Sequence, residues 1–210
     1  MMNFLVGFLV LVSSFTKHVE HFEGKINIVQ TTLYDTSFFT YYVKGCNVRV
    51  DKFDKNNQFV SSLIINLQKE EVFVVSPVKK MYSKLTIYNT GSSENENYII
   101  KKTENCKIVN GYECYQWRIK NIERNTEVAY WVLQNDFYFF DKMVSLLART
   151  EDSYAFFEKI PGKDGFFPML SVERTLLRRE KSRTAVVEIN KKPVEDNLFI
   201  IPSDYELVLK

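Results

Sequence analysis

Apolar and polar side chains alternate with a period of two along most of this chain, and this pattern constrains the fold more than any other feature. In residues 22–28 (FEGKINI) every second residue is apolar or glycine, and the residues between them are charged or polar. Successive side chains of a β-strand point to opposite faces, so this alternation predicts strands with one buried face. We find no repeated strand–helix–strand pattern, which favours an antiparallel sheet.

About ten segments follow this pattern, and one segment does not. Apolar residues recur at helical spacing over Phe137–Leu147, with Asp136 as a suitable N-cap, and a short helical piece is expected near 153–158. The fold class is therefore mainly β (α+β): a strongly curved antiparallel sheet, or unclosed β-barrel, packed on one principal helix. The strand segments are 22–28, 38–53 with a bulge or close backbone approach at Gly45, 59–67, 71–75, 79–87, 98–106, 112–120, 126–132, 169–178, 183–190 and 199–209.

The composition supports a mainly β fold and argues against nucleic acid as a partner. The chain has 17 Phe and 12 Tyr, residue types that favour strands and carry much apolar burial. A formal net charge of +2 gives no field strong enough to indicate nucleic acid binding.

The first 16 residues differ from the rest of the chain. Residues 4–12 form a nine-residue apolar run followed by Ser13 and Ser14, which is too short to span a membrane but typical of a secretory signal peptide. No Lys or Arg precedes the run, so the alternative is a buried first element of the mature fold. We expect a signal peptide over 1–16 and a single domain over 17–210, with the polar segment 89–97 as a loop within it rather than a linker. Nothing after the leader is long enough to form a transmembrane segment.

Three cysteines allow one disulfide. A three-residue loop at 109–111, around the turn-forming Asn110-Gly111, would place Cys106 opposite Cys114, and a bridge would suit an oxidising compartment. A two-residue loop would separate the pair. Cys46 is expected to be a small buried hydrophobe.

Six short stretches of the sequence, taken in order, carry a resemblance to known proteins: 22–26, 42–49, 76–82, 108–114, 129–132 and 199–205. Together they resemble an uncharacterised family of exported bacterial proteins, a domain of unknown function. That family is associated with the fold of the periplasmic lipoprotein carriers (LolA-like), an unclosed antiparallel β-barrel with a helical lid whose apolar interior receives acyl chains. The resemblance therefore implies a lipid or lipoprotein acyl chain as partner, without matching the carriers' own functional residues.

The candidate ligand surface is the apolar face of the predicted helix with the strand residues that it would cover. Such residues suit an acyl chain because each unpaired polar group that is buried costs about 1–3 kcal/mol. The same residues would equally form an ordinary core, and only a cavity separates the two interpretations. The candidates are Ile26, Ile28, Val43, Leu63, Ile65, Phe73, Trp117, Trp131, Phe137, Phe140, Met143, Val144 and Leu147.

Catalytic and metal sites are not expected. The only histidines, His18 and His21, lie just after the leader, where a solvated terminus is the simpler interpretation than a metal site. No familiar nucleotide-binding, hydrolase or zinc motif is present, so we predict no catalytic residues and no cofactor. The basic cluster at 178–183 is interpreted as a charged turn that keeps the protein soluble, with contact to anionic lipid as the alternative.

These features predict a periplasmic or secreted binding protein of the bacterial envelope that shelters a lipid-like or acylated ligand in a half-barrel. The alternative is an envelope protein-interaction module with a solid core, no ligand cavity and a protein partner.

Overall fold

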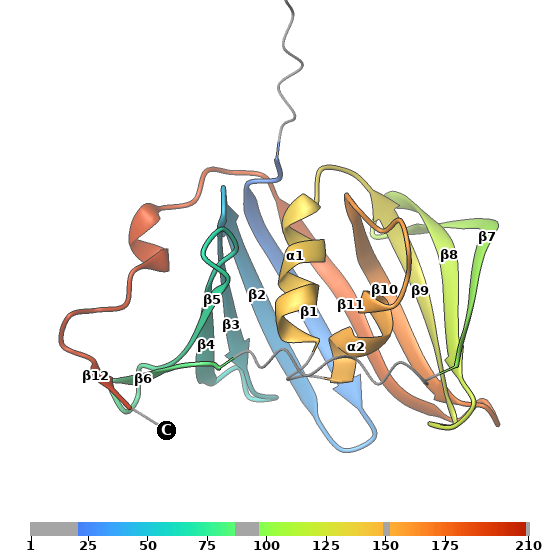
Figure 1. Cartoon of the computed structure of the whole chain (residues 1–210), viewed down its shortest axis with the longest axis horizontal. Coiled ribbons are helices and arrows are strands. Elements are labelled where there is room, and N and C mark those ends of the chain that lie inside the picture. The colour runs from blue at the N-terminus through green and yellow to red at the C-terminus, as the bar shows by residue number, and fades with distance from the viewer. Residues whose placement is uncertain (1–20, 87–96, 149–151, 209–210) are drawn as a thin grey trace, which may run out of the picture.

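The computed structural model describes residues 21–86, 97–148 and 152–208, and its strands form one twelve-stranded sheet (Figure 1). The order across the sheet is β12-β6-β5-β4-β3-β2-β1-β11-β10-β9-β8-β7. The strands are β1 Gly24–Thr32, β2 Thr36–Lys44, β3 Asn47–Phe53, β4 Phe59–Asn66, β5 Glu71–Ser76, β6 Met81–Lys84, β7 Tyr98–Val109, β8 Tyr112–Asn121, β9 Thr126–Gln134, β10 Phe166–Thr175, β11 Glu180–Asn190 and β12 Glu206–Leu207.

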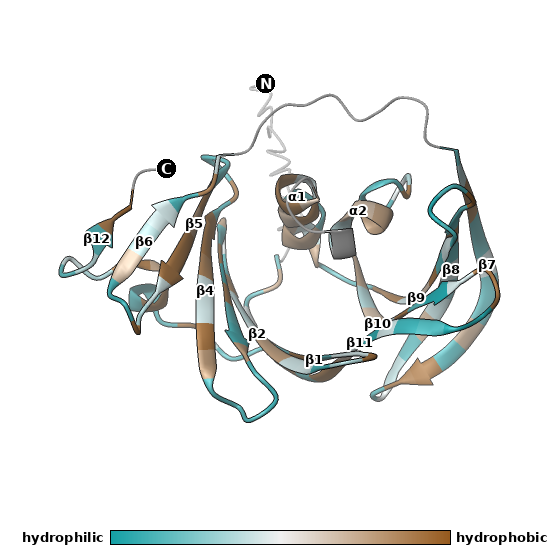
Figure 2. Cartoon of the chain, turned by 90° about the horizontal axis from the view of Figure 1, so that it is seen from below, coloured by the Kyte–Doolittle hydropathy of each residue, from teal (hydrophilic) through white to brown (hydrophobic). Residues whose placement is uncertain are grey.

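The sheet is bent into an unclosed trough that holds the helices on its concave face (Figure 2). All neighbouring strands are antiparallel except β12, which pairs with β6 in parallel. Pairing of β1 with β11 joins the N-terminal strands to the C-terminal ones, and β7 and β12 are the two free edges. Strands account for 56% and helices for 11% of the structure, so the predicted mainly β class is confirmed.

Two helices fill the trough. Helix α1 (Tyr138–Leu147) buries Phe139, Phe140, Met143, Val144, Leu146 and Leu147, and α2 (Asp152–Glu158) follows it. Both helices were expected from the sequence. The predicted cap was wrong, because Phe137 occupies the N-cap position and no side chain caps the helix. The backbone amide of Asp136 instead donates to Asn135 Oδ1 at 2.9 Å.

Two tight turns correct the sequence predictions. The segment 38–53 is not one strand: Gly45, at φ 55°, occupies the first central position of a two-residue turn between β2 and β3. Nothing lies within 4 Å of the place where a Cβ of Gly45 would be, so there is no close backbone approach.

The turn between β7 and β8 has two residues rather than three. Asn110 and Gly111 both have positive φ, at 49° and 82°, and Val109 pairs with Tyr112. Cys106 consequently lies opposite Tyr115 on one face, while Cys114 is buried on the other face. The predicted disulfide is therefore wrong, and both thiols are free.

A C-terminal strap, residues 191–205, crosses the convex face and carries the 3-10 helix η1 (Asp196–Phe199). Lys44 Nζ donates to Val194 O at 3.0 Å, and Arg49 Nη1 donates to Leu198 O at 3.0 Å. These bonds hold the strap on the sheet up to β12, which pairs with β6 and forms the edge.

Some predictions fall outside the described residues. They are the signal peptide at 1–16, His18 and the loop at 89–96. Cys46 is exposed, not buried as predicted. None of the described helices is both long and apolar enough to cross a membrane.

Candidate ligand-binding site

A cavity of about 100 Å³ lies between the helix pair and the concave face of the sheet. Its walls come from β1, β2, β9, β10 and β11 below and from α1 and α2 above. The lining residues are Ile28, Gln30, Phe39, Tyr41, Val128, Tyr130, Phe140, Tyr154, Phe156, Phe157, Phe167, Pro168, Ser171, Glu173, Ser182 and Thr184.

Aromatic rings form the wall beneath the helices. The ring centroids of Phe140 and Phe167 are 4.6 Å apart, those of Phe140 and Phe157 5.3 Å, and those of Tyr130 and Phe157 5.1 Å. All three pairs are edge-to-face, an arrangement that adds about 0.5–1.5 kcal/mol per pair beyond burial. The wall is therefore apolar and well packed.

The helix pair is fastened to the sheet by polar contacts on both sides of the cavity. The hydroxyls of Tyr41 on β2 and Tyr154 on α2 are 2.7 Å apart. On the other side, Lys102 Nζ on β7 donates to the carbonyls of Pro161 and Gly162, after α2, at 2.6 and 3.0 Å. These contacts hold the helix pair and the loop after it over the concave face of the sheet.

Tyr130 is the unusual polar group of the cavity. Its side chain is 3% exposed, and its hydroxyl has no hydrogen-bond partner among the described residues. Burial raises the pKa of this hydroxyl well above its ordinary value, and the Glu173 carboxylate raises it further. Buried polar groups are normally bonded, so the Tyr130 hydroxyl is an unfavourable group in the wall of the cavity.

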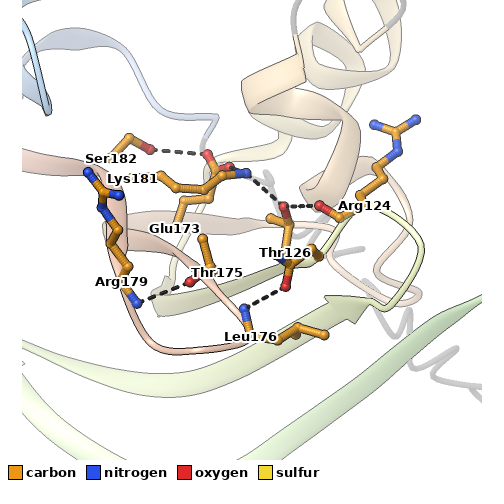
Figure 3. A network of polar contacts seen from close by, with 9 residues as sticks. Arg124, Thr126, Glu173, Thr175, Leu176, Arg179, Lys181 and Ser182 are labelled. Atoms are coloured by element: carbon orange, nitrogen blue, oxygen red, sulfur yellow. Dashed lines mark hydrogen bonds and ion pairs between the residues drawn. The ribbon is translucent and has the colours of Figure 1, made fainter.

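The cavity is polar at one end. Glu173 accepts from Lys181 Nζ at 2.9 Å and from Ser182 Oγ at 3.2 Å (Figure 3). Lys181 Nζ also donates to Thr126 Oγ1 at 2.8 Å. Strand register places Ser171 directly beside Tyr130 and Thr184 beside Ser171 on the same face. The lining thus changes from aromatic to hydroxyl- and carboxylate-bearing.

Of the thirteen predicted lining residues, only Ile28 and Phe140 line the cavity. Two were assigned to the wrong face: Phe73 pairs with Ile64, and Trp131, under Lys107 Nζ at 4.2 Å, alternates with Tyr130. Leu63 is half-buried against the core. The remaining eight pack in the core, namely Ile26, Val43, Ile65, Trp117, Phe137, Met143, Val144 and Leu147.

The sequence prediction missed Tyr130, Glu173 and the aromatic residues of α2. Alternation along β9 could have located Tyr130, because Val128 and Val132 flank it at spacing two and all three are buried. Glu173 carries no such signal, since a carboxylate on a strand is ordinarily assigned to the solvated face.

Comparison with known proteins gives a family and a fold. A model for a domain of unknown function (DUF4412) matches residues 22–205. None of the curated proteins is similar enough to match. An uncharacterized conserved protein from Thermus thermophilus shares the fold, with a TM-score of 0.51, 10% identity and 88% of each chain covered.

Two further solved structures are weaker matches, and their TM-scores are too low to support an argument. A chain of the Pseudomonas aeruginosa MucA/MucB complex is 8% identical with a TM-score of 0.48, and 88% of this chain aligns with 57% of that one. A provisionally named outer membrane lipoprotein-sorting domain from Vibrio parahaemolyticus is 6% identical with a TM-score of 0.32, covering 84% and 87% of the two chains. Because the family model spans nearly all the described residues, the chain belongs to the DUF4412 family.

Proposed function

We propose that this protein binds an amphipathic, lipid-like molecule between its helix pair and the concave face of its sheet. The observation that carries the proposal is the buried, unbonded hydroxyl of Tyr130 in a cavity wall that is aromatic at one end and polar at the other. A ligand oxygen that accepts a hydrogen bond from Tyr130 would remove an unfavourable contribution of about 1–3 kcal/mol. Its apolar part would lie against Phe140, Phe157 and Phe167.

The size of the cavity requires the helices to move when the ligand enters. Drug-sized ligands occupy pockets of roughly 300–1,000 Å³, whereas this cavity has about 100 Å³. Helix α2 is short, and the Tyr41–Tyr154 contact is one of the bonds that keep it on the sheet. Opening there would enlarge the cavity without breaking any strand pairing.

The proposal includes location and mechanism. The apolar leader of the sequence supports export to the periplasm or to the medium, and the ligand would be carried rather than chemically altered. A lipid or a lipoprotein acyl chain is the partner class that fits an aromatic wall ending in hydroxyls.

Titration with a dansylated fatty acid, followed by native mass spectrometry of the delipidated protein, tests the proposal. Ser171→Phe adds bulk inside the cavity and is expected to weaken binding at least tenfold. Val187→Phe adds bulk on the exposed face of β11 and serves as the matched control. A delipidated protein that takes up no fatty acid, or a Ser171→Phe variant that binds as tightly as the control, would contradict the proposal.

The alternative function is a protein-interaction module with a solid core. It is favoured by the small volume of the cavity, because the aromatic wall already occupies most of the trough. This alternative predicts no fatty-acid uptake, together with a Ser171→Phe variant less stable than the natural protein, because a solid core has no room for the added ring.

A further inference from the structure

Five hairpins turn at the same end of the sheet, and three neighbouring ones each expose a large apolar side chain there. The three turns are 33–35 between β1 and β2, 176–179 between β10 and β11, and 122–125 between β8 and β9. Strand pairing makes these turns neighbours, because Thr32 before the first turn pairs with Ser182 and Thr175 before the second pairs with Thr126 after the third. We call the three turns the hairpin-tip end; it lies at the bottom of Figure 1.

The apolar side chains of these turns are largely exposed to solvent. Tyr34 is 91% exposed, Leu177 89% and Ile122 59%. Isolated exposed apolar residues are ordinary, but large ones at the apex of three adjacent turns form a surface that water solvates poorly.

Two arginines lie in the 176–179 turn, whereas the 33–35 turn carries Asp35 and the 122–125 turn carries both Glu123 and Arg124. Residues 173–183 contain five Lys or Arg and two Glu, a local charge of +3, whereas the whole chain carries +2. Glu180 pairs with Arg174 and Arg183, and Glu173 pairs with Lys181, so the carboxylates of this hairpin are already occupied. Arg178 and Arg179, next to Leu177, are at the apex of the same turn and add positive charge there.

The hairpin-tip end is held rigid. Asn125 Oδ1 accepts from the Leu176 amide at 3.2 Å, which ties two of the turns together, and Thr175 Oγ1 accepts from the Arg179 amide at 3.1 Å (Figure 3). In the third turn, Thr32 Oγ1 accepts from the Asp35 amide at 3.0 Å. A preformed surface loses little conformational entropy on binding.

We propose that the hairpin-tip end docks onto an anionic lipid surface. Apolar apices backed by guanidinium groups match a membrane interface in depth, because the apices reach the acyl boundary while the cations remain among anionic headgroups. An acidic protein surface would complement the arginines but not the protruding Tyr34 and Leu177. This inference goes beyond the ligand pocket and can fail independently of it.

Vesicle flotation tests the inference with the full chain. The protein is expected to float with phosphatidylcholine vesicles that contain phosphatidylglycerol, to bind weakly to phosphatidylcholine alone, and to dissociate as salt rises. Removing two charges with Arg178→Gln/Arg179→Gln should weaken binding roughly 30-fold, from about fivefold per charge. Tyr34→Ser/Leu177→Ser should weaken it by more than about tenfold.

Matched controls lie at the opposite end of the sheet. Ile108, 67% exposed beside the β7–β8 turn, gives the apolar control Ile108→Ser, and Lys191→Gln/Lys192→Gln gives the charge control. Equal thermal melting would verify that the variants fold. Absence of binding to phosphatidylglycerol vesicles, or equal losses in the tip and control variants, would overturn the inference, while fatty-acid uptake would still report on the pocket.

Discussion

Replacing Tyr130 with Phe should make the protein more stable and a poorer binder. The substitution removes only the hydroxyl, which is buried in the cavity wall without a partner among the described residues. An unsatisfied buried hydroxyl costs about 1–3 kcal/mol, and the small void left by its removal returns part of that gain. We therefore expect a net increase of about 1 kcal/mol in the free energy of unfolding, or roughly 2–4 °C in Tm for a domain of this size.

The matched control is Tyr41→Phe, which removes a hydroxyl of the same kind from the same cavity. This hydroxyl lies 2.7 Å from that of Tyr154, so its loss should lower the free energy of unfolding by about 0.5–1.5 kcal/mol. The two isosteric variants should thus change stability in opposite directions. Urea unfolding monitored by fluorescence measures both, provided that the slope with denaturant stays constant.

Fatty-acid titration of the same variants completes the experiment. If Tyr130 donates to the ligand, Tyr130→Phe should weaken binding about fivefold to tenfold, since a net hydrogen bond contributes roughly 1 kcal/mol. A destabilised Tyr130→Phe protein would show that the hydroxyl is satisfied in solution. The proposal that the Tyr130 hydroxyl lacks a hydrogen-bond partner until a ligand binds would then be wrong.

Three further predictions concern titration, thiol chemistry and backbone space. Burial raises the folded-state pKa of Tyr130 above its ordinary 10.0, so the unfolded state loses this proton first as pH rises. The free energy of unfolding should therefore fall by about 1.4 kcal/mol per pH unit above pH ~10. Urea unfolding across alkaline pH measures this fall, which should be less steep in Tyr130→Phe. Burial raises the pKa of Cys114 to about 11, so native-state alkylation followed by mass spectrometry should modify the exposed Cys46 and Cys106 and spare Cys114. Gly24→Ala would place a Cβ 2.2 Å from Asn190 O and should lower Tm by several degrees in thermal melting, whereas Gly45→Ala, with open space around it, should cost less.

Alternation predicted the sheet because one buried face imposes period two on most of the strands, and the spacing becomes helical over 138–147. It failed where two β-segments join without a polar spacer. The β2–β3 turn consists of Gly45 and Cys46, so the sequence reads as one long strand. The disulfide prediction was wrong for a related reason. Asn110-Gly111 fits loops of two or three residues, and changing the loop length by one residue moves the opposing side chain to the other face of the sheet.

The candidate site was predicted less well, because a lining residue and a core residue obey the same pattern. Ile26 and Ile28 alternate identically on β1, yet only Ile28 meets the cavity, since which residues the helices cover depends on tertiary packing. For Phe73 and Trp131 the predicted face was wrong, because the neighbouring residues Val72 and Tyr130 occupy the inward positions of their strands. Both faces of these strands carry apolar or aromatic side chains, so composition alone does not distinguish them.

The polar end of the cavity and the hairpin-tip end share one piece of structure. Glu173 and Ser182 line the cavity, while residues 176–179 form the turn that connects their two strands. The bonds from Lys181 to Glu173 and Thr126 therefore lie between the proposed ligand and the proposed membrane contact. Lys181→Met, which keeps the length of the side chain and removes its charge, should disturb both readouts, whereas Arg178→Gln/Arg179→Gln should affect vesicle binding alone. If Lys181→Met changed neither fatty-acid nor vesicle binding, the two surfaces would be energetically independent despite their shared hairpin.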